Sequence, residues 1–140
     1  THQNQGATAG SLANRLAGLD AALIALRDGL GSTWSSTVVA VVTEFGRTVH
    51  VNGTRGTDHG TATAAILLGG AVSGGRVLAD WPGLAKSDLY EDRDLMPTAD
   101  TRSLFKGILA DHLAVPDAML ERSIFPDSAR AKPMKDLIRT

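Results

Sequence analysis

The sequence predicts an α/β protein in which helices flank a mostly parallel β-sheet. A long amphipathic helix comes first, and the apolar, β-branched run that follows it has the composition of a strand covered on both faces. A second apolar strand follows after a polar loop. Because the predicted helix is followed by strands with the composition of buried ones, a largely parallel sheet is favoured. The chain has 140 residues, of which 43% are hydrophobic, and this length is enough for one globular domain.

The first predicted helix begins at Ser11, which we expect to cap it, and ends near Gly29 and Gly31. Its leucines recur at intervals of four and three residues, so they share one face of the helix. They are Leu12, Leu16, Leu19, Leu23, Leu26 and Leu30. We expect this row of leucines to belong to the hydrophobic core.

The predicted strands cover residues 37–43 and 64–68, with residues 76–79 as a short third candidate. The first two runs are continuously apolar, as buried strands are. Residues 80–97 mix proline, glycine and charged side chains, which is typical of an irregular surface segment. The sheet is therefore expected to form before this segment.

Two more helices are predicted in the last third of the chain. The longer one begins after Thr98, as its capping residue, and ends at Leu113, and a shorter one covers residues 116–124. We assign residues 1–127 to one domain and residues 128–140 to a peripheral tail.

The composition argues against several classes of protein. The formal net charge is −1 and the basic residues are scattered, so no basic stripe indicates a nucleic-acid partner. The apolar runs are shorter than the roughly 20 residues of a membrane-spanning helix, and we expect no membrane span. Cysteine is absent, which excludes disulfides and thiolate metal sites. Because the chain begins with Thr1 instead of Met, we interpret it as processed from a longer one.

Polar residues that could bind a metal gather around the loop between the two predicted strands. Glu44 directly follows the first strand, and Asp58 and His59 precede the second. Ligands of open α/β sheets bind beyond strand ends, so we expect a carboxylate and an imidazole in one pocket. This pair suits zinc, iron or manganese. The alternative is a polar turn in which Glu44 pairs with Arg47 and His59 serves only as a hydrogen-bonding residue.

Several motifs, taken in order, resemble one family. They read TEFGRT (43–48), GTDHGTATAAILLGGAVSGGRVLADWPGL (56–84), LYEDRDLMPTADTRSLFKGILADHLAV (89–115) and IFPDS (124–128). The sequence resembles the C-terminal part of an uncharacterised, sulfatase-like bacterial family, a domain of unknown function in the alkaline phosphatase superfamily. The resemblance covers nearly the whole chain. It implies that residues 1–127 form a partial alkaline-phosphatase-like sandwich, and that the protein is exported or periplasmic.

The resemblance also implies a metal site beside an anionic substrate. The implied ligands are His2, Glu44, Asp58 and His59. The implied cofactor is a divalent metal such as zinc, manganese, iron or calcium, and Arg47 is implied as the residue that binds the substrate. Phe45 stands where the superfamily usually has a second metal-binding histidine.

The implied function is that of the C-terminal metal-binding portion of an exported, metal-dependent hydrolase of phosphate or sulfate esters. The nucleophile of such enzymes precedes this segment, so we expect no catalytic residue in the chain and no activity from the chain alone. Its expected partners are an anionic ester and either the N-terminal half of the enzyme or a second copy of the chain. The alternative, which Phe45 favours, is a non-catalytic binding or structural module of the cell envelope with a decayed metal site.

Overall fold

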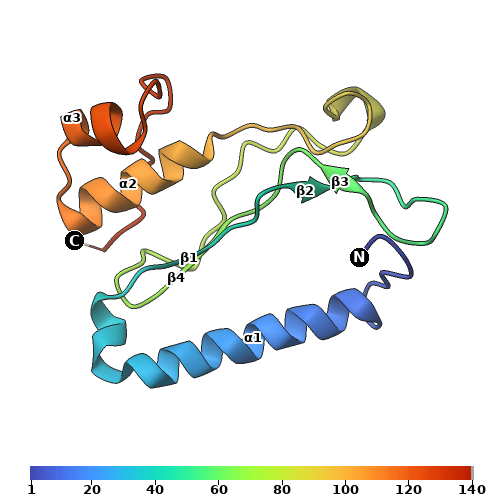
Figure 1. The fold of residues 1–140 in the computed structure, drawn as a ribbon, viewed down its shortest axis with the longest axis horizontal. Coiled ribbons are helices and arrows are strands. Elements are labelled where there is room, and N and C mark those ends of the chain that lie inside the picture. The colour runs from blue at the N-terminus through green and yellow to red at the C-terminus, as the bar shows by residue number, and fades with distance from the viewer. Residues whose placement is uncertain (140) are drawn as a thin grey trace. The chain divides into compact units, whose positions relative to one another are not determined.

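A computed structural model describes residues 1–139 and divides the chain into two compact units. The first unit consists of Thr1–Ser32, Val41–Ile66 and Trp81–Pro97, and the second of Thr33–Ala40, Leu67–Asp80 and Thr98–Thr140. The chain therefore passes between the units several times, and Figure 1 follows its course by colour.

Helix α1 of the first unit spans Ser11–Leu30, as the leucine spacing predicts. Gly10, not Ser11, is the residue that precedes its first turn. Gly31 ends the helix with φ of 52°, a left-handed conformation that favours glycine. The expectation that its leucines belong to the core is wrong for the described residues, because α1 has no buried residue and Leu16 is 54% exposed. A 3₁₀ helix, Gly31–Ser36, follows it.

The predicted sheet is the main correction to the fold. Strand β1 (Val39–Val41) pairs with β4 (Ile66–Leu68), and β2 (Gly46–Arg47) pairs with β3 (His59–Gly60). The second pair is antiparallel. Residues 1–139 thus contain two separate two-stranded sheets, and neither a mostly parallel sheet flanked by helices nor a partial alkaline-phosphatase-like sandwich is formed.

The predicted sheet does not form because an apolar run can specify a strand but not the strands with which it pairs. The runs at residues 37–43 and 64–68 do become extended, but only three residues of each enter a strand. Composition fixes the extended conformation of such a run, whereas the number and direction of its neighbours depend on residues far along the chain. The third candidate, residues 76–79, forms no strand, and its Val77 is 89% exposed.

The segment predicted to be irregular has little regular secondary structure, as expected. Residues 81–97 contain one 3₁₀ turn, Lys86–Asp88, among turns and extended stretches. Tyr90 and Asp94 close a tight turn, with backbone hydrogen bonds in both directions at 2.9 and 3.0 Å. This turn holds Asp94, of which 1% is exposed, inside the first unit.

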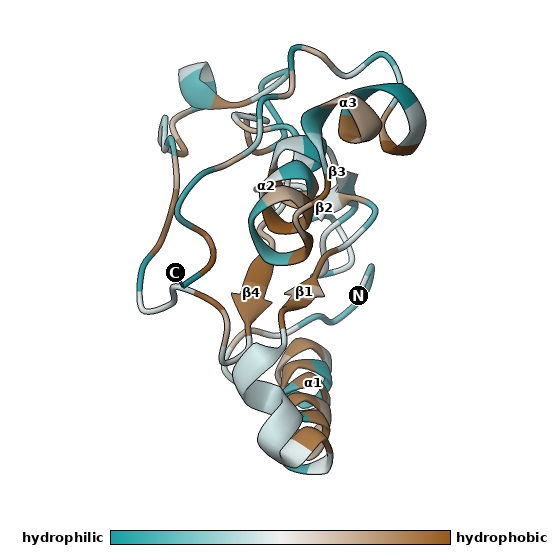
Figure 2. Ribbon diagram, turned by 90° about the vertical axis from the view of Figure 1, so that its left-hand side faces the viewer, coloured by the Kyte–Doolittle hydropathy of each residue, from teal (hydrophilic) through white to brown (hydrophobic). Residues whose placement is uncertain are grey.

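The second unit has its core under helix α2, Thr101–Leu113. Asp100, instead of Thr98, caps it by accepting a hydrogen bond of 2.8 Å from the amide of Arg102. Leu104 and Ile108 of α2 are buried with Leu137, and apolar residues of β1 and β4 pack against them. Figure 2 shows the hydrophobic strands β1 and β4 beside α2.

The end of the chain contributes to this core. Ala131 and Leu137 are each 4% exposed, and the amide of Arg139 donates to the carbonyl of Ala71 at 2.8 Å. Before this segment come α3, Asp117–Met119, and a π-helical turn η3, Leu120–Ile124, whose Leu120 is fully buried. None of the helices in residues 1–139 is both long and apolar enough to cross a membrane.

Candidate functional site

Strands β2 and β3 bring the candidate residues of the loop together. Their antiparallel register places Gly46 opposite Gly60 and Arg47 opposite His59. A Cβ on Gly60 would lie 2.6 Å from the backbone carbonyl group of Arg47, so only glycine allows the two strands to approach this closely. The ladder thereby fixes the distance between the backbones that carry Arg47 and His59.

The first residues of the chain dock on the loop that precedes β3. The amide of Asn4 donates to the carbonyl of Thr54 at 3.0 Å, and the amide of Gln5 donates to that of Arg55 at 2.9 Å. A Cβ on Gly56 would lie 2.2 Å from the carbonyl oxygen of His2, so the two backbones touch at this point. These backbone contacts place the side chain of His2 beside those of Asp58 and His59.

Asn52 is the polar centre of this loop, although it is not among the candidate residues that the sequence identifies. Its Nδ2 donates to the carbonyl of His2 at 3.0 Å and to Oδ1 of Asp58 at 2.9 Å. Its Oδ1 accepts from the amides of Thr54 and Gly56, both at 3.0 Å. The signal in the sequence is the Asn-Gly pair, which indicates a turn but does not indicate the hydrogen-bond partners of the Asn52 side chain.

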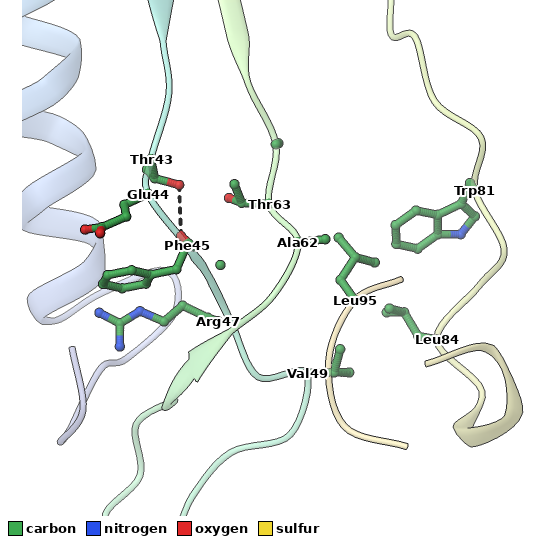
Figure 3. Close-up of a pocket in the computed structure, with 12 residues that line it drawn as sticks. Thr43, Glu44, Phe45, Arg47, Val49, Ala62, Thr63, Trp81, Leu84 and Leu95 are labelled. Atoms are coloured by element: carbon green, nitrogen blue, oxygen red, sulfur yellow. Dashed lines mark hydrogen bonds between the residues drawn. The ribbon is translucent and has the colours of Figure 1, made fainter. Parts of the chain in front are cut away.

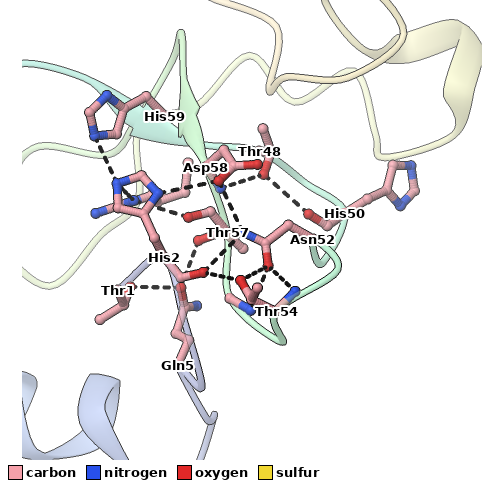
Figure 4. Close-up of polar contacts among 12 residues, drawn as sticks. Thr1, His2, Gln5, Thr48, His50, Asn52, Thr54, Thr57, Asp58 and His59 are labelled. Atoms are coloured by element: carbon pink, nitrogen blue, oxygen red, sulfur yellow. Dashed lines mark hydrogen bonds and ion pairs between the residues drawn. The ribbon is translucent and has the colours of Figure 1, made fainter.

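Two histidines and one aspartate form the cluster at the centre of the site, which Figure 4 shows. His2 Nδ1 lies 3.2 Å from Oδ1 of Asp58, and His2 Nε2 lies 3.1 Å from Nε2 of His59. Hydrogen bonds from Asn52 and then from His2 lower the pKa of Asp58 below its ordinary value of 3.8. Asp58 is therefore an anion at neutral pH. We call His2, Asp58 and His59 the imidazole cluster.

The charge on Asp58 determines where the proton of His2 lies. An anionic carboxylate accepts the proton of Nδ1, so in the neutral imidazole of His2 the lone pair lies on Nε2. That lone pair faces Nε2 of His59, and Nη1 of Arg47 lies 3.4 Å from it. Arg47 Nη1 also donates to the carbonyl of Thr57 at 3.1 Å, which holds the guanidinium at the edge of the imidazole cluster.

Phe45 packs on the imidazole cluster through His59. Its ring centroid lies 4.0 Å from that of His59, with 32° between the ring planes. The phenyl ring therefore covers one side of the His59 imidazole, and the His2 ring lies 4.8 Å from His59, at 52°.

Glu44 does not join the imidazole cluster. It forms no hydrogen bond or ion pair within residues 1–139, and the alternative salt bridge to Arg47 is not formed either. It lines an open cavity of about 700 Å³ in the first unit, together with Phe45 and Arg47. Figure 3 shows these three side chains on one side of β2 and the apolar Trp81, Leu84 and Leu95 on the other.

The structure thus brings together three of the four predicted ligands, and the fourth, Glu44, is elsewhere. Across residues 1–139, no three His, Cys, Asp or Glu side chains are arranged to hold one metal ion. The reason is that Asp58 faces Nδ1 of His2, on the opposite edge of the ring from the two Nε2 atoms. The imidazole cluster therefore offers two nitrogen atoms and one carboxylate that orients them.

The comparison with known proteins corrects the family. The family model described as protein of unknown function (DUF1501) matches residues 1–124, and the chain belongs to this family. Membership of a sulfatase-like family in the alkaline phosphatase superfamily is therefore wrong, because DUF1501 is a distinct family. Neither the curated proteins nor the solved structures gave a match to the chain. The exported location that the resemblance implied stays a prediction.

Proposed function

We propose that this member of the DUF1501 family binds one divalent transition-metal ion through the Nε2 atoms of His2 and His59. The observation that carries this proposal is their separation of 3.1 Å. Two imidazole nitrogens at 2.0–2.1 Å from one tetrahedral zinc ion lie about 3.3 Å apart. A metal ion can therefore enter with a small outward movement of the two rings.

Asp58 supports the same proposal. Metal-binding histidines usually donate their other ring N–H to a carboxylate, which fixes the tautomer and makes the ligating nitrogen more basic. Asp58 lies 3.2 Å from Nδ1 of His2 and has a lowered pKa, so it meets both requirements. Two imidazole ligands favour zinc, iron or manganese over calcium, which prefers oxygen ligands.

We further propose that the reaction at this site is hydrolysis of phosphate or sulfate esters. A metal ion held by two protein nitrogens keeps coordination positions open for water or for a substrate oxygen, which it would polarise. The guanidinium of Arg47, 3.4 Å from His2 Nε2, is placed to meet the anionic group of such a substrate. Catalytic zinc usually has three protein ligands, so we expect the isolated chain to bind metal without measurable hydrolysis.

The second candidate is a non-catalytic binding module in which the imidazole cluster only fastens the first residues of the chain. The close approach of Arg47 favours it, because a guanidinium 3.4 Å from His2 Nε2 repels a metal ion. In this case His59 donates to His2 Nε2, and every polar atom between them is satisfied without metal.

The test is isothermal titration of the chain with Zn²⁺, Mn²⁺ and Fe²⁺. The proposal expects one ion per chain, lost in His59→Ala and in His2→Ala. His50→Ala is the matched control, because His50 is exposed in the same region and its ring makes no hydrogen bond within the described residues. Absence of binding, or an equal loss in His50→Ala, favours the non-catalytic module. Release of 4-nitrophenol from its phosphate and sulfate esters tests the reaction.

A further inference from the structure

Helix α1 carries a row of leucines, none of which is buried within residues 1–139; Leu12, Leu19, Leu23 and Leu30 are half-buried, and the other two are exposed. The row follows the sequence intervals four, three, four, three, four over the 20 residues of the helix. Leu16 is 54% and Leu26 is 42% exposed. A helix of this length is about 30 Å long, so the apolar row is a substantial surface.

The spacing of this row is that of a coiled coil. Its intervals alternate between four and three, so equivalent leucines recur every seven residues. This repeat keeps the row along the contact of a supercoiled pair of helices, whereas a helix that covers a globular core has a broader apolar face. In heptad notation, the a positions are Leu16, Leu23 and Leu30, and the d positions are Leu12, Leu19 and Leu26. Every a and d position of α1 is therefore leucine. We call this row the leucine seam.

The charges beside the leucine seam select a partner and a direction. Arg15 is at a g position, and Asp20 is at the e position five residues later. In a parallel pair of identical helices, each g residue faces the e residue five positions later on the other helix, so two Arg15–Asp20 pairs form by symmetry. An antiparallel pair would instead bring the two Asp20 carboxylates near each other. Neither Arg15 nor Asp20 has an ion-pair partner within the described residues.

We propose that α1 is an interaction surface for a second copy of this chain, and that the two α1 helices form a parallel, two-stranded coiled coil along the leucine seam. The seam spans about three heptads, which is near the lower limit for a coiled coil. The dimer is therefore expected to be reversible and to depend on protein concentration. This inference does not rest on the proposed metal site.

Disulfide trapping tests the direction, and the chain has no cysteine that would interfere. Leu26→Cys places a thiol at a d position near one end of α1, which meets its own counterpart only in a parallel dimer. Ala21→Cys is the matched control, because Ala21 is exposed and lies at an f position, opposite the leucine seam. In a glutathione redox buffer, Leu26→Cys should yield cross-linked dimer and Ala21→Cys should yield several-fold less. Equal yields, or none from Leu26→Cys, overturn the parallel pairing.

Sedimentation equilibrium tests the surface itself. The native chain should be dimeric, and Leu23→Lys should be a folded monomer by circular dichroism. A monomeric native chain that loses its fold in Leu23→Lys would mean that the leucines cover other parts of the same chain, and it would overturn the proposal. Arg15→Glu and Asp20→Arg should each weaken the dimer several-fold, and a mixture of the two variants should associate at least as tightly as the native chain. Failure of the mixture to recover association would contradict the charge pairing.

Discussion

Asn52 and Asp58 are joined by a hydrogen bond of 2.9 Å, in which the amide nitrogen of Asn52 donates to the same carboxylate oxygen that faces His2. Asn52 donates to the carbonyl of His2 as well. One side chain therefore places both members of the His2–Asp58 pair, although Asn52 itself lies in neither strand of the β2–β3 ladder.

Asn52→Asp should weaken metal binding without unfolding the chain. The new carboxylate can still accept from the amides of Thr54 and Gly56, but it cannot donate to Asp58 and repels it. Loss of a residue that orients a metal ligand typically costs 10–100-fold in affinity. Titration with Zn²⁺ measures the effect, and Asn14→Asp on the exposed face of α1 is the control for the added charge. Equal affinities for the two variants would contradict the role of Asn52.

The contact between His2 and Asp58 should weaken in acid. Hydrogen bonds from Asn52 and His2 hold the pKa of Asp58 below 3.8 in the folded chain. The ionised form therefore stabilises the docked segment fully above about pH 3.8, and this stabilisation is lost as the pH falls through the folded-state pKa. A carbon-13 NMR titration of the Asp58 carboxyl should show a midpoint below 3.8 that rises in Asn52→Ala. A midpoint that is the same in both proteins would show that Asn52 does not act on Asp58.

Asp94→Ala should destabilise the first unit. Asp94 is 1% exposed, and its carboxylate accepts two hydrogen bonds from Arg93 at 2.8 and 3.0 Å and one from Thr61 at 2.9 Å. Removing this acceptor deletes three hydrogen bonds to a buried, charged carboxylate and should lower the free energy of unfolding by about 1–3 kcal/mol. Urea denaturation measures the change, with the exposed Asp80→Ala as the control. A loss no larger than that of Asp80→Ala would mean that the turn holds without this carboxylate.

Two glycine substitutions should have opposite effects. Gly60→Ala places a Cβ 2.6 Å from the backbone carbonyl group of Arg47, so the β2–β3 ladder must open and His59 must move. Gly18→Ala on α1 meets nothing within 4 Å and should stabilise the helix by up to about 1 kcal/mol. Thermal unfolding should show a lower midpoint for Gly60→Ala and an equal or higher one for Gly18→Ala. A tolerated Gly60→Ala would mean that the two strands can separate without cost.

The elements that the sequence predicts well are those that depend on local spacing. The bounds of α1 follow from leucines that are close together along the chain, and Asp58 and His59 stand out as neighbours in a glycine-rich loop. The end of α2 at Leu113 is predicted for the same reason. In each case the residues that decide the structure lie within a few positions of one another.

The parts that the sequence does not predict depend on contacts between distant segments. Glu44 follows β1 as expected, yet its side chain is not directed to His59, because the antiparallel β2–β3 pairing sets a different edge from the predicted parallel sheet. The role of Asn52 depends on where His2 docks, 50 positions earlier in the chain. Neither relationship leaves a periodic pattern in the sequence.

The stacking of Phe45 on His59 supplies a spectroscopic reporter for the whole region. With the ring centroids 4.0 Å apart, the ring current of the phenyl group shifts the imidazole proton resonances of His59 upfield. The chain has 4 histidines, so this signal can be resolved in a simple proton spectrum. Its position will move when the rings separate, whether an ion, an acid titration or a substitution drives them apart.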